Sequence, residues 1–484
     1  MTEFPGGTGL VLNEPLLWEK GKKGRQGLSL PERDVPAAAL DPGLAGEGPD
    51  FPDLSEVDLV RHYTRLSTWN FGVDLGMYPL GSCTMKYNPK INEKMAALPG
   101  LARLHPLLPT EMSQGALKLI HDLARFLCEV TGMDAASVQP AAGAHGELAG
   151  MLILKAFDHS RGQSRGKIIV PDTAHGTNPA SAALCGFKPV GVSSGEQGIL
   201  TTEAVAQVMD EDTAGIMVTN PNTLGLFEEN LAAVADIVHE KGGLVYCDGA
   251  NMNAIMGIVH LGRLGVDVMH LNLHKTFSTP HGGGGPGSGP VLVKKALEKF
   301  LPLPRVVEEN GRYVLAEDFP DSIGRLHSFY GNFGVMIKAY CYILSLGPEL
   351  KKVSQMAVLN ANYVKESLKD IFHLMFDRPC MHECVFSDRR QREHRVSTLD
   401  MVKRLMDYGF HPPTIYFPLV VPGAIMVEPT ETESKEDLDL FIQAMRDIAA
   451  EAEQNPDKLR EAPSRTRVSR MDETAAARRP CLTG

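Results

Sequence analysis

The sequence predicts an α/β protein with a large, doubly wound, mostly parallel sheet domain and a smaller C-terminal α+β domain. Two observations support this prediction. From about residue 115 to 330, short β-rich runs alternate with helical patterns, which is typical of parallel strands joined by helical crossovers. From about residue 335, the pattern changes to long helices with one β-like stretch. With 484 residues, the chain is long enough for both domains.

Each predicted element of the large domain follows from its local pattern. Strands are expected at 136–139, 167–170, 189–192, 215–219, 243–247 and 266–271, with a further apparent strand at 289–293. The helices between them are expected at 147–157, 202–209, 231–241 and 250–261.

The rest of the chain divides into an arm, a small domain and a tail. Residues 1–75 carry many prolines and glycines and are predicted to form an N-terminal arm, so that the large domain covers 76–330. The small domain, 331–457, is expected to contain helices at 335–346, 350–371 and 435–453 and a β-like stretch at 375–386. The tail, 458–484, is rich in Arg, Ser, Ala and Pro and is predicted to be disordered.

The bulk composition argues against nucleic acid and membranes as partners. The net charge is −11, whereas nucleic acids and anionic membranes attract basic surfaces. No stretch approaches the roughly 20 apolar residues of a membrane span, and the N-terminus lacks the pattern of a secretion signal. Eight cysteines, none in a C-x-x-C pair, indicate reduced thiols. We therefore expect a cytoplasmic enzyme.

Lys275 and Asp248 are the candidate catalytic pair. Lys275 lies just beyond an apolar strand and beside a glycine-rich loop, and Asp248 ends the preceding strand. In a β-α-β unit, the carboxyl ends of both strands open onto the edge of the sheet where ligands bind. A lysine for the aldehyde and a carboxylate for the pyridine nitrogen are two main contacts that proteins make with pyridoxal phosphate. The alternative for Asp248 alone is a cap on the following helix.

Two further loops predict binding of a phosphate and of a ring. The turn around Gly143, Ala144 and His145 leads from a strand into a helix, whose N-terminal N–H groups favour anions. In the loop after the strand at 167–170, His175 is expected to stack on the pyridine ring and Thr177 to reach the phosphate or the phenolate. A turn histidine with satisfied hydrogen bonds is the alternative for His175. The cofactor candidates also include Ala250 and His274, which are close in sequence to Asp248 and Lys275.

Rival interpretations of the glycine loop fit less well. The loop at 282–287 matches G-x-G-x-x-G, but that fingerprint must join a strand directly to a helix, and here Pro286 and another apparent strand follow. No G-x-S-x-G elbow accompanies the esterase-like His281-Gly-Gly-Gly284, and Lys275 lacks the preceding Walker glycine. Histidines 270, 274 and 281 show no metal-ligand spacing, so no metal site is predicted.

Long motifs in the chain resemble the P-protein family of the glycine cleavage system, glycine dehydrogenase (decarboxylating). The motif around the lysine is Leu273-His-Lys-Thr-Phe-Ser-Thr-Pro-His-Gly-Gly-Gly-Gly-Pro-Gly287. The other matching motifs are His62–Thr68, Tyr78–Pro89, Ala174–Ser181, Phe329–Phe333, Tyr408–Pro418 and Glu428–Lys435. The resemblance covers roughly residues 15 to 455, and the chain is similar to the C-terminal half of the single-chain enzyme, the separate subunit 2 of many bacteria. One departure is His145, where the family pattern has Gln.

The resemblance implies a fold-type I pyridoxal-phosphate enzyme of glycine catabolism, classed as an oxidoreductase. Its implied reaction is decarboxylation of glycine, with release of CO2 and transfer of the aminomethyl group to the lipoyl arm of the H-protein. Its implied assembly is an α2β2 heterotetramer with subunit 1. Under this reading Lys275, Asp248 and His175 are catalytic.

Further residues are predicted to contact the substrate or the lipoyl arm. The candidates are Ser82, Cys83, Lys86, Asn88, Arg325 and His411. An interfacial salt bridge is an equal alternative for Lys86. Two other functions remain open at this point: another fold-type I amino-acid decarboxylase or aminotransferase that uses no lipoyl partner, and a non-catalytic subunit that binds the cofactor as a scaffold.

Overall fold

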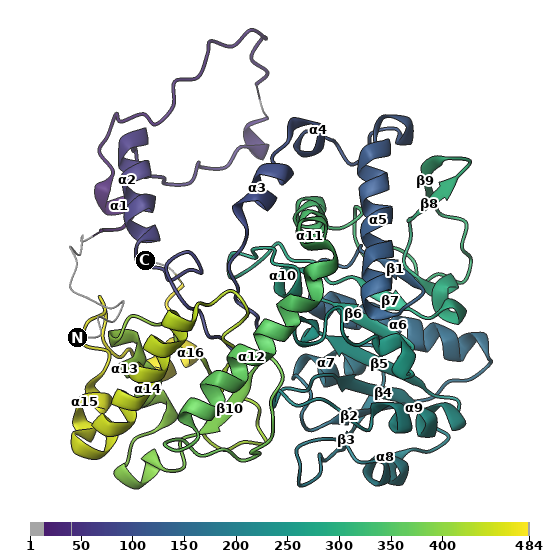
Figure 1. Ribbon diagram of the computed structural model, residues 1–484. Coiled ribbons are helices and arrows are strands. Elements are labelled where there is room, and N and C mark those ends of the chain that lie inside the picture. The colour runs from purple at the N-terminus through teal and green to yellow at the C-terminus, as the bar shows by residue number, and fades with distance from the viewer. Residues whose placement is uncertain (1–13, 40, 483–484) are drawn as a thin grey trace.

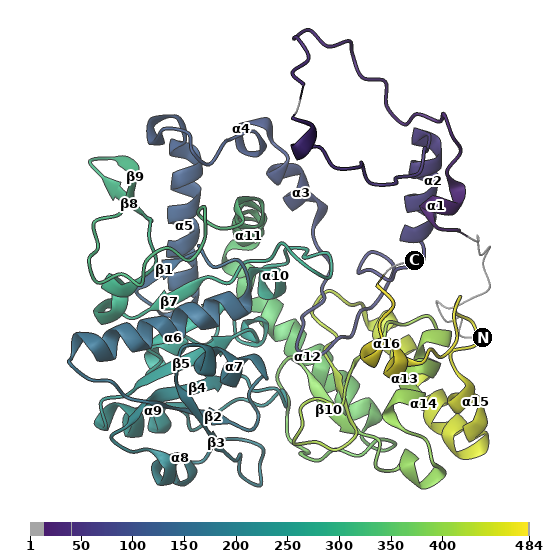
Figure 2. The same cartoon turned by 180° about the vertical axis from the view of Figure 1, so that it is seen from behind.

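A computed structural model describes residues 14–39 and 41–482 of the chain. The described residues form two packed bodies, one around a large sheet and one around a small sheet near the C-terminus (Figure 1). Seen from behind, the N-terminal segment with α1 and α2 extends away from the large sheet, on the side of the C-terminal helices (Figure 2). Among the described residues, no helix combines the length and apolar character that a membrane span requires.

The large sheet confirms the doubly wound, mostly parallel prediction. Within the described residues it has seven strands in the order β1-β7-β6-β5-β4-β2-β3. Neighbouring strands pair in parallel from β6 to β3, and β7 runs antiparallel to both of its neighbours. The strands are β1 (Ala135–Ser137), β2 (Lys167–Pro171), β3 (Lys188–Val192), β4 (Thr213–Thr219), β5 (Leu244–Gly249), β6 (Val268–Leu271) and β7 (Val291–Val293).

Apolar residues alternate between the two faces of this sheet, and each face packs against helices. In β5, Val245 and Cys247 belong to the core on one face, whereas Leu244 and Tyr246 belong to the core on the other. This alternation is what a strand buried on both faces requires. One face is covered by α5 (Gln114–Thr131), α8 (Thr202–Val208), α9 (Leu231–Glu240) and α11 (Phe333–Leu346), and the other by α6 (Gly143–Ser160) and α7 (Thr177–Leu184).

The helix predicted at 250–261 is wrong. The crossover from β5 to β6 contains two short 3₁₀ turns, Met252–Ala254 and Leu261–Leu264. Gly257 has a φ of 71°, in the left-handed region that ends a helix. The side chain of Asn251 donates instead to the carbonyl of Pro221 at 2.9 Å. The crossover still returns the chain in the parallel direction, so the position of the sheet edge is unaffected.

A second core lies around a small antiparallel sheet of order β10-β12-β11. Of the predicted β-like stretch 375–386, only its end is a strand. α11, predicted in the small domain, packs in the core of the large sheet. We therefore propose that the domain boundary falls near α12. The elements are β10 (Cys384–Ser387), β11 (Thr414–Ile415), β12 (Ala424–Val427), α12 (Leu350–Leu368), α13 (Thr398–Asp407) and α14 (Lys435–Gln454).

The C-terminal end of the described chain contacts the small sheet domain. The tail predicted to be disordered is placed by hydrogen bonds: the amides of Ser464 and Arg465 donate to Asp407, and Arg470 pairs with Asp400. The remaining elements are α1 (Leu17–Lys20), α2 (Glu56–Ser67), α3 (Lys90–Ala96), α4 (Pro99–Ala102), α10 (Leu273–Thr276), β8 (Arg305–Glu309), β9 (Arg312–Ala316), α15 (Pro456–Glu461) and α16 (Glu473–Arg478).

Candidate active site

A cavity of about 190 Å³ opens at the carboxyl edge of the parallel strands, between the N-terminal end of α6 and the loops after β2, β4, β5 and β6. This is the edge at which open α/β sheets bind ligands. The residues that line it are Ser82, Gly143, Ala144, Glu147, His175, Thr177, Thr219, Thr223, Asp248, Ala250, Asn251, His270, Asn272, His274 and Lys275.

Lys275 lies in α10, a single turn that follows β6. Its side chain is partly buried, and its Nζ donates to the carbonyl oxygen of Ser82 at 2.8 Å. The contact brings the segment before α3 to the wall of the cavity. Thus the amine predicted to react lies in the same cavity as Asp248, as the parallel strand order requires.

Asp248 ends β5 and is 3% exposed. Asn178 Nδ2 donates to its Oδ2 at 3.0 Å, and the amide of Ala250 donates to its Oδ1 at 2.9 Å. Burial raises the pKa of the Asp248 carboxyl, but His270 and the bond from Asn178 outweigh it and leave the pKa below its usual value. Because no helix follows directly, the interpretation of Asp248 as a helix cap is wrong. An ionised carboxylate is therefore held at the base of the cavity.

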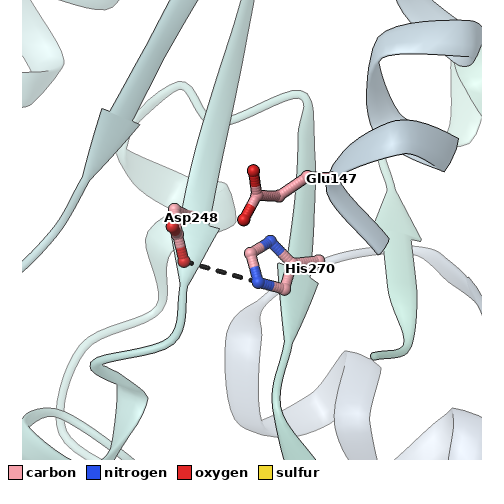
Figure 3. A group of neighbouring side chains, drawn as sticks. All are labelled: Glu147, Asp248 and His270. Atoms are coloured by element: carbon pink, nitrogen blue, oxygen red, sulfur yellow. Dashed lines mark ion pairs between the residues drawn. The ribbon is translucent and has the colours of Figure 1, made fainter. Parts of the chain in front are cut away.

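Behind Asp248, three buried polar residues form a network that was not singled out from the sequence. His270 Nε2 lies 3.4 Å from Asp248 Oδ1, and its Nδ1 bonds to Tyr246 Oη at 2.6 Å. Glu147, from the first turns of α6, lies next to both His270 and Asp248 (Figure 3). His270 Nε2 is the ring nitrogen that faces the Asp248 carboxylate, while Nδ1 is occupied by Tyr246. This arrangement holds the carboxylate in its charged form.

His175 and Thr177 lie on the opposite side of the cavity, in the turn that starts α7. His175 is exposed, and its Nδ1 bonds to Thr177 Oγ1 at 2.8 Å. Thr177 Oγ1 also donates to Glu147 Oε1 at 2.7 Å. The ring of His175 is therefore oriented by α7 and α6, and it remains accessible at the mouth of the cavity.

The N-terminus of α6 faces the cavity through Gly143 and Ala144. Within the described residues, the N-cap Ala142 supplies no side-chain cap, so the first N–H groups of this 18-residue helix keep their donors for a ligand. A Cβ on Gly143 would lie 2.7 Å from Asn272 Nδ2, so this position has room for glycine alone. His145 does not line the cavity, because its Nδ1 accepts from the amide of Ala141 at 3.2 Å.

Among the substrate candidates, Ser82 alone lines the cavity. Cys83 is next to it, and burial raises the pKa of its thiol. Asn88 donates to Ser278 Oγ at 3.3 Å, away from the cavity. Arg325 forms an exposed ion pair with Glu317.

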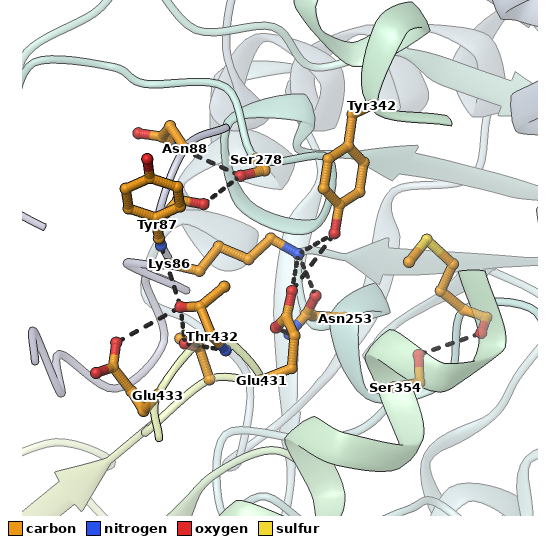
Figure 4. Close-up of polar contacts among 12 residues, drawn as sticks. Lys86, Tyr87, Asn88, Asn253, Ser278, Tyr342, Ser354, Glu431, Thr432 and Glu433 are labelled. Carbon is orange, nitrogen blue, oxygen red and sulfur yellow. Dashed lines mark hydrogen bonds and ion pairs between the residues drawn. The ribbon is translucent and has the colours of Figure 1, made fainter. Parts of the chain in front are cut away.

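His411 and Lys86 lie elsewhere in the protein. His411 stacks on Tyr78, with ring centroids 3.7 Å apart. Lys86 is fully buried and bonds to Asn253, Tyr342 and Glu431 (Figure 4). The structure therefore gives Lys86 a salt bridge within this chain, whereas the predicted alternative was an interfacial one. It gives Lys86 no contact with the cavity.

Comparisons with known proteins show the family of this chain. Residues 52–310 match the family model described as "Glycine cleavage system P-protein", and residues 353–466 match "Glycine dehydrogenase, C-terminal domain". A relative from Caldanaerobacter subterraneus, named probable glycine dehydrogenase (decarboxylating) subunit 2, is 58% identical over 96% of this chain and 98% of its own length. A Bacillus licheniformis relative with the same name is 56% identical over 97% of this chain and 98% of its own length.

Solved structures confirm the fold class. A crystal structure of an inhibitor-bound glycine decarboxylase (P-protein) of the glycine cleavage system superposes with a TM-score of 0.72 at 20% identity, over 84% of this chain and 93% of that one. The Escherichia coli cysteine desulfurase CsdA superposes with a TM-score of 0.59 at 15% identity, over 78% of this chain and 95% of that one. The sequence matches extend over nearly the whole chain, and the chain therefore belongs to the family of glycine dehydrogenase (decarboxylating) subunit 2, the P-protein of the glycine cleavage system.

Proposed function

We propose that this subunit decarboxylates glycine with pyridoxal phosphate and transfers the remaining aminomethyl group to the lipoyl arm of the H-protein, with release of CO2. The observation that carries the proposal is the placement of Lys275 and Asp248 in one cavity, at the edge of the sheet. Membership of the family supplies the substrate, because the relatives are named glycine dehydrogenase (decarboxylating).

The residues of the cavity fit pyridoxal phosphate. The N-terminus of α6, which has no side-chain cap, suits a phosphate. Gly143 lines the cavity there, and its lack of a side chain allows Asn272 to pack closely against it. Asp248 is the buried carboxylate that a pyridine nitrogen requires, and Lys275 is the amine that would hold the aldehyde carbon. Thr177 and Ala250 lie within the same cavity and complete the set.

When bound, pyridoxal phosphate supplies an electron sink for the electron pair left on the glycine α-carbon as CO2 departs. Asp248, whose pKa lies below its usual value, would favour a proton on the ring nitrogen of a bound cofactor. The His270–Tyr246 pair fixes the orientation of Asp248. His175, at the mouth of the cavity, would limit the position of the ring, and Lys275 would be the amine able to accept and return a proton.

Subunit 1 and the lipoylated H-protein are the proposed partners. The relatives are named subunit 2, which supports a partner subunit, and the family model names the glycine cleavage system. We propose an α2β2 heterotetramer in the cytoplasm. The candidates Ser82, Cys83, Asn88, Arg325 and His411 remain proposals for contact with the substrate or the lipoyl arm, with Ser82 supported by its place in the cavity wall.

The exchange of labelled CO2 with the glycine carboxyl tests this function. The full chain is combined with subunit 1 and lipoylated H-protein, and Lys275→Ala is compared with Lys295→Ala, whose side chain is 80% exposed. We expect Lys275→Ala to abolish the exchange and Lys295→Ala to preserve it. Substantial exchange in Lys275→Ala would refute the proposal. Exchange that needs no lipoylated carrier would favour a decarboxylase without a lipoyl partner.

A further inference from the structure

Two buried glutamates lie beneath the loop that contacts the reactive lysine. Glu383 directly precedes β10 and Glu428 directly follows β12, so the pairing of these two strands brings them together. Both residues have 0% exposure. One carboxylate oxygen of each glutamate and one ring nitrogen of His382 lie within 4.8 Å of one another. Neither glutamate lines the cavity or takes part in the mechanism described above.

Each glutamate uses one oxygen to hold residues 82–84, here called the 82–84 loop. The amide of Ser82 donates to Glu383 Oε2 at 2.7 Å, and the amide of Thr84 donates to Glu428 Oε2 at 2.9 Å. Both Ser82 and Thr84 have positive φ, 66° and 48°, which is costly for residues with a Cβ. The loop therefore needs strong acceptors to keep this shape, and the two carboxyl groups supply them.

The same loop carries the carbonyl that meets Lys275. Ser82 donates its N–H to Glu383 and accepts from Lys275 Nζ with its oxygen, so one residue connects the glutamate to the lysine. Gly81 fixes the loop from the other side, since a Cβ there would lie 2.2 Å from Met426 Cγ in β12. A shift in the glutamates would thus move the wall of the cavity next to Lys275.

The other oxygen of each glutamate makes no hydrogen bond within the described part of the chain, although the Thr84 side chain also lies beside Glu428. Glu383 Oε1 and Glu428 Oε1 are both buried without a hydrogen-bond partner. Two buried carboxylates whose oxygens lie within 4.8 Å of one another repel each other when both are charged, and a proton held by the pair removes this repulsion.

We infer that Glu383 and Glu428 share one proton between their Oε1 atoms and act together as positioning residues that hold the 82–84 loop against Lys275. The role of the loop rests on the proposed function, whereas the shared proton does not. In this arrangement the acid pair carries a single negative charge. The Oε2 atoms accept the N–H groups of Ser82 and Thr84 whichever glutamate carries the proton.

The surroundings of the pair favour a retained proton. Burial raises the pKa of Glu428 to about 7 and raises that of Glu383 well above its usual value. Burial lowers the pKa of His382 to about 3, so this histidine brings no positive charge at neutral pH. The titratable groups that face the pair are Lys275, His382, Glu431, Cys83, Cys380 and Cys384.

A metal ion is the alternative occupant of this cluster. Histidines that bind metals almost always donate their second ring N–H to a neighbouring acceptor. In the described residues, neither ring nitrogen of His382 has a hydrogen-bond partner. This favours the shared proton over the ion.

Glutamine substitutions distinguish the shared proton from a simple structural role. In Glu383→Gln or Glu428→Gln, the amide oxygen accepts the loop N–H and the amide nitrogen donates to the remaining carboxylate, which reproduces the singly protonated pair. In the double variant, two amide NH₂ groups face each other without an acceptor. We therefore expect each single variant to keep the borohydride-trapped pyridoxyl group on Lys275 at wild-type level. The double variant is expected to lose roughly 100-fold in exchange rate, the order that a displacement of about 1 Å costs.

Infrared difference spectra of the cofactor-free full chain test the proton directly. At neutral pH, the wild-type spectrum minus that of either single variant is expected to show the carbonyl stretch of one protonated carboxyl. Glu433→Gln is the matched control: burial also raises the pKa of Glu433 to about 7, but Glu433 makes no contact with the 82–84 loop. This control is expected to leave the trapping on Lys275 unchanged.

Three results would overturn the inference. The first is the absence of the protonated carboxyl band that either single variant should remove. The second is a loss of exchange rate in a single variant as large as in the double variant. The third is a stoichiometric metal ion in the purified protein that both single variants lose. Because the infrared measurement needs no cofactor, a failure of the proposed function would leave it intact and would be recognised separately.

Discussion

Lys86 anchors a buried ion pair between distant parts of the chain, and its removal is predicted to affect stability and not substrate binding. Its ammonium donates to Glu431 Oε1 and Asn253 Oδ1, each at 2.8 Å, and to Tyr342 Oη at 3.1 Å (Figure 4). The side chains of Lys86 and Glu431 are 1% and 9% exposed. The pair joins the segment before α3 to the segment after β12.

The cost depends on which partner is removed. Glu431→Leu leaves a buried ammonium without its counter-charge, which destabilises a protein by about 3–5 kcal/mol. The double variant Lys86→Met/Glu431→Leu removes both charges while it keeps the volume filled, so most of the loss is expected to be recovered. The control is Asp74→Ala, because the Lys90–Asp74 pair is 53% and 57% exposed and is worth about 0–1 kcal/mol.

Urea unfolding midpoints of the full chain measure this cost, and the KM for glycine in the reconstituted enzyme measures substrate binding. We expect the midpoint to fall strongly for Glu431→Leu, to return toward wild type in the double variant and to stay unchanged for Asp74→Ala. The double variant is expected to keep the wild-type KM. A double variant with a wild-type midpoint and a much larger KM would refute this reasoning and restore Lys86 as a substrate residue.

Three further predictions follow from the site and the buried acids. Asp248→Asn is expected to slow CO2 exchange roughly 100- to 1,000-fold, the range for loss of one preorganised charge, with the surface variant Asp236→Asn unchanged; a wild-type rate would contradict the role of Asp248. Gly143→Ala is expected to weaken pyridoxal phosphate binding in a spectral titration, because its Cβ would meet Asn272 at 2.7 Å, whereas Gly115→Ala, with open space at its Cβ, is expected to bind normally. Burial raises the pKa of Glu228 from 4.5 to about 7, so its contribution to stability is complete below pH 4.5 and is lost as pH rises through 7. Between pH 4.5 and 7, the free energy of unfolding of Glu228→Gln is expected to fall less steeply than that of the wild type. The difference is expected to reach at most about 3 kcal/mol, and parallel pH dependences would contradict this.

The position of Lys275 and Asp248 at the same edge of the sheet could be predicted from the sequence, because the direction of the two strands determines it. Parallel strands end at one edge, and this holds whether the crossover between them is a helix or, as here, two 3₁₀ turns. The error at 250–261 arose because apolar spacing alone does not show that Asn251 bonds to a distant carbonyl or that Gly257 takes a positive φ.

The residues that support the site could not be predicted in the same way. Glu147 and His270 come from different elements and contact Asp248 only after the sheet forms. The acid pair depends on the pairing of β10 with β12, whose residues are separated by about 40 positions and carry no motif around Glu383. The signal in the sequence for His270 is its register position, opposite Asp248 in the neighbouring strand.

The most direct test of the central claim is borohydride reduction of the purified full chain with pyridoxal phosphate, with and without subunit 1, followed by peptide mass mapping. We expect a pyridoxyl group on the peptide that contains Lys275. A group on this peptide only after subunit 1 is added would also support the role of Lys275 and would show that the assembly completes the site. A group on another lysine, or none under either condition, would contradict it.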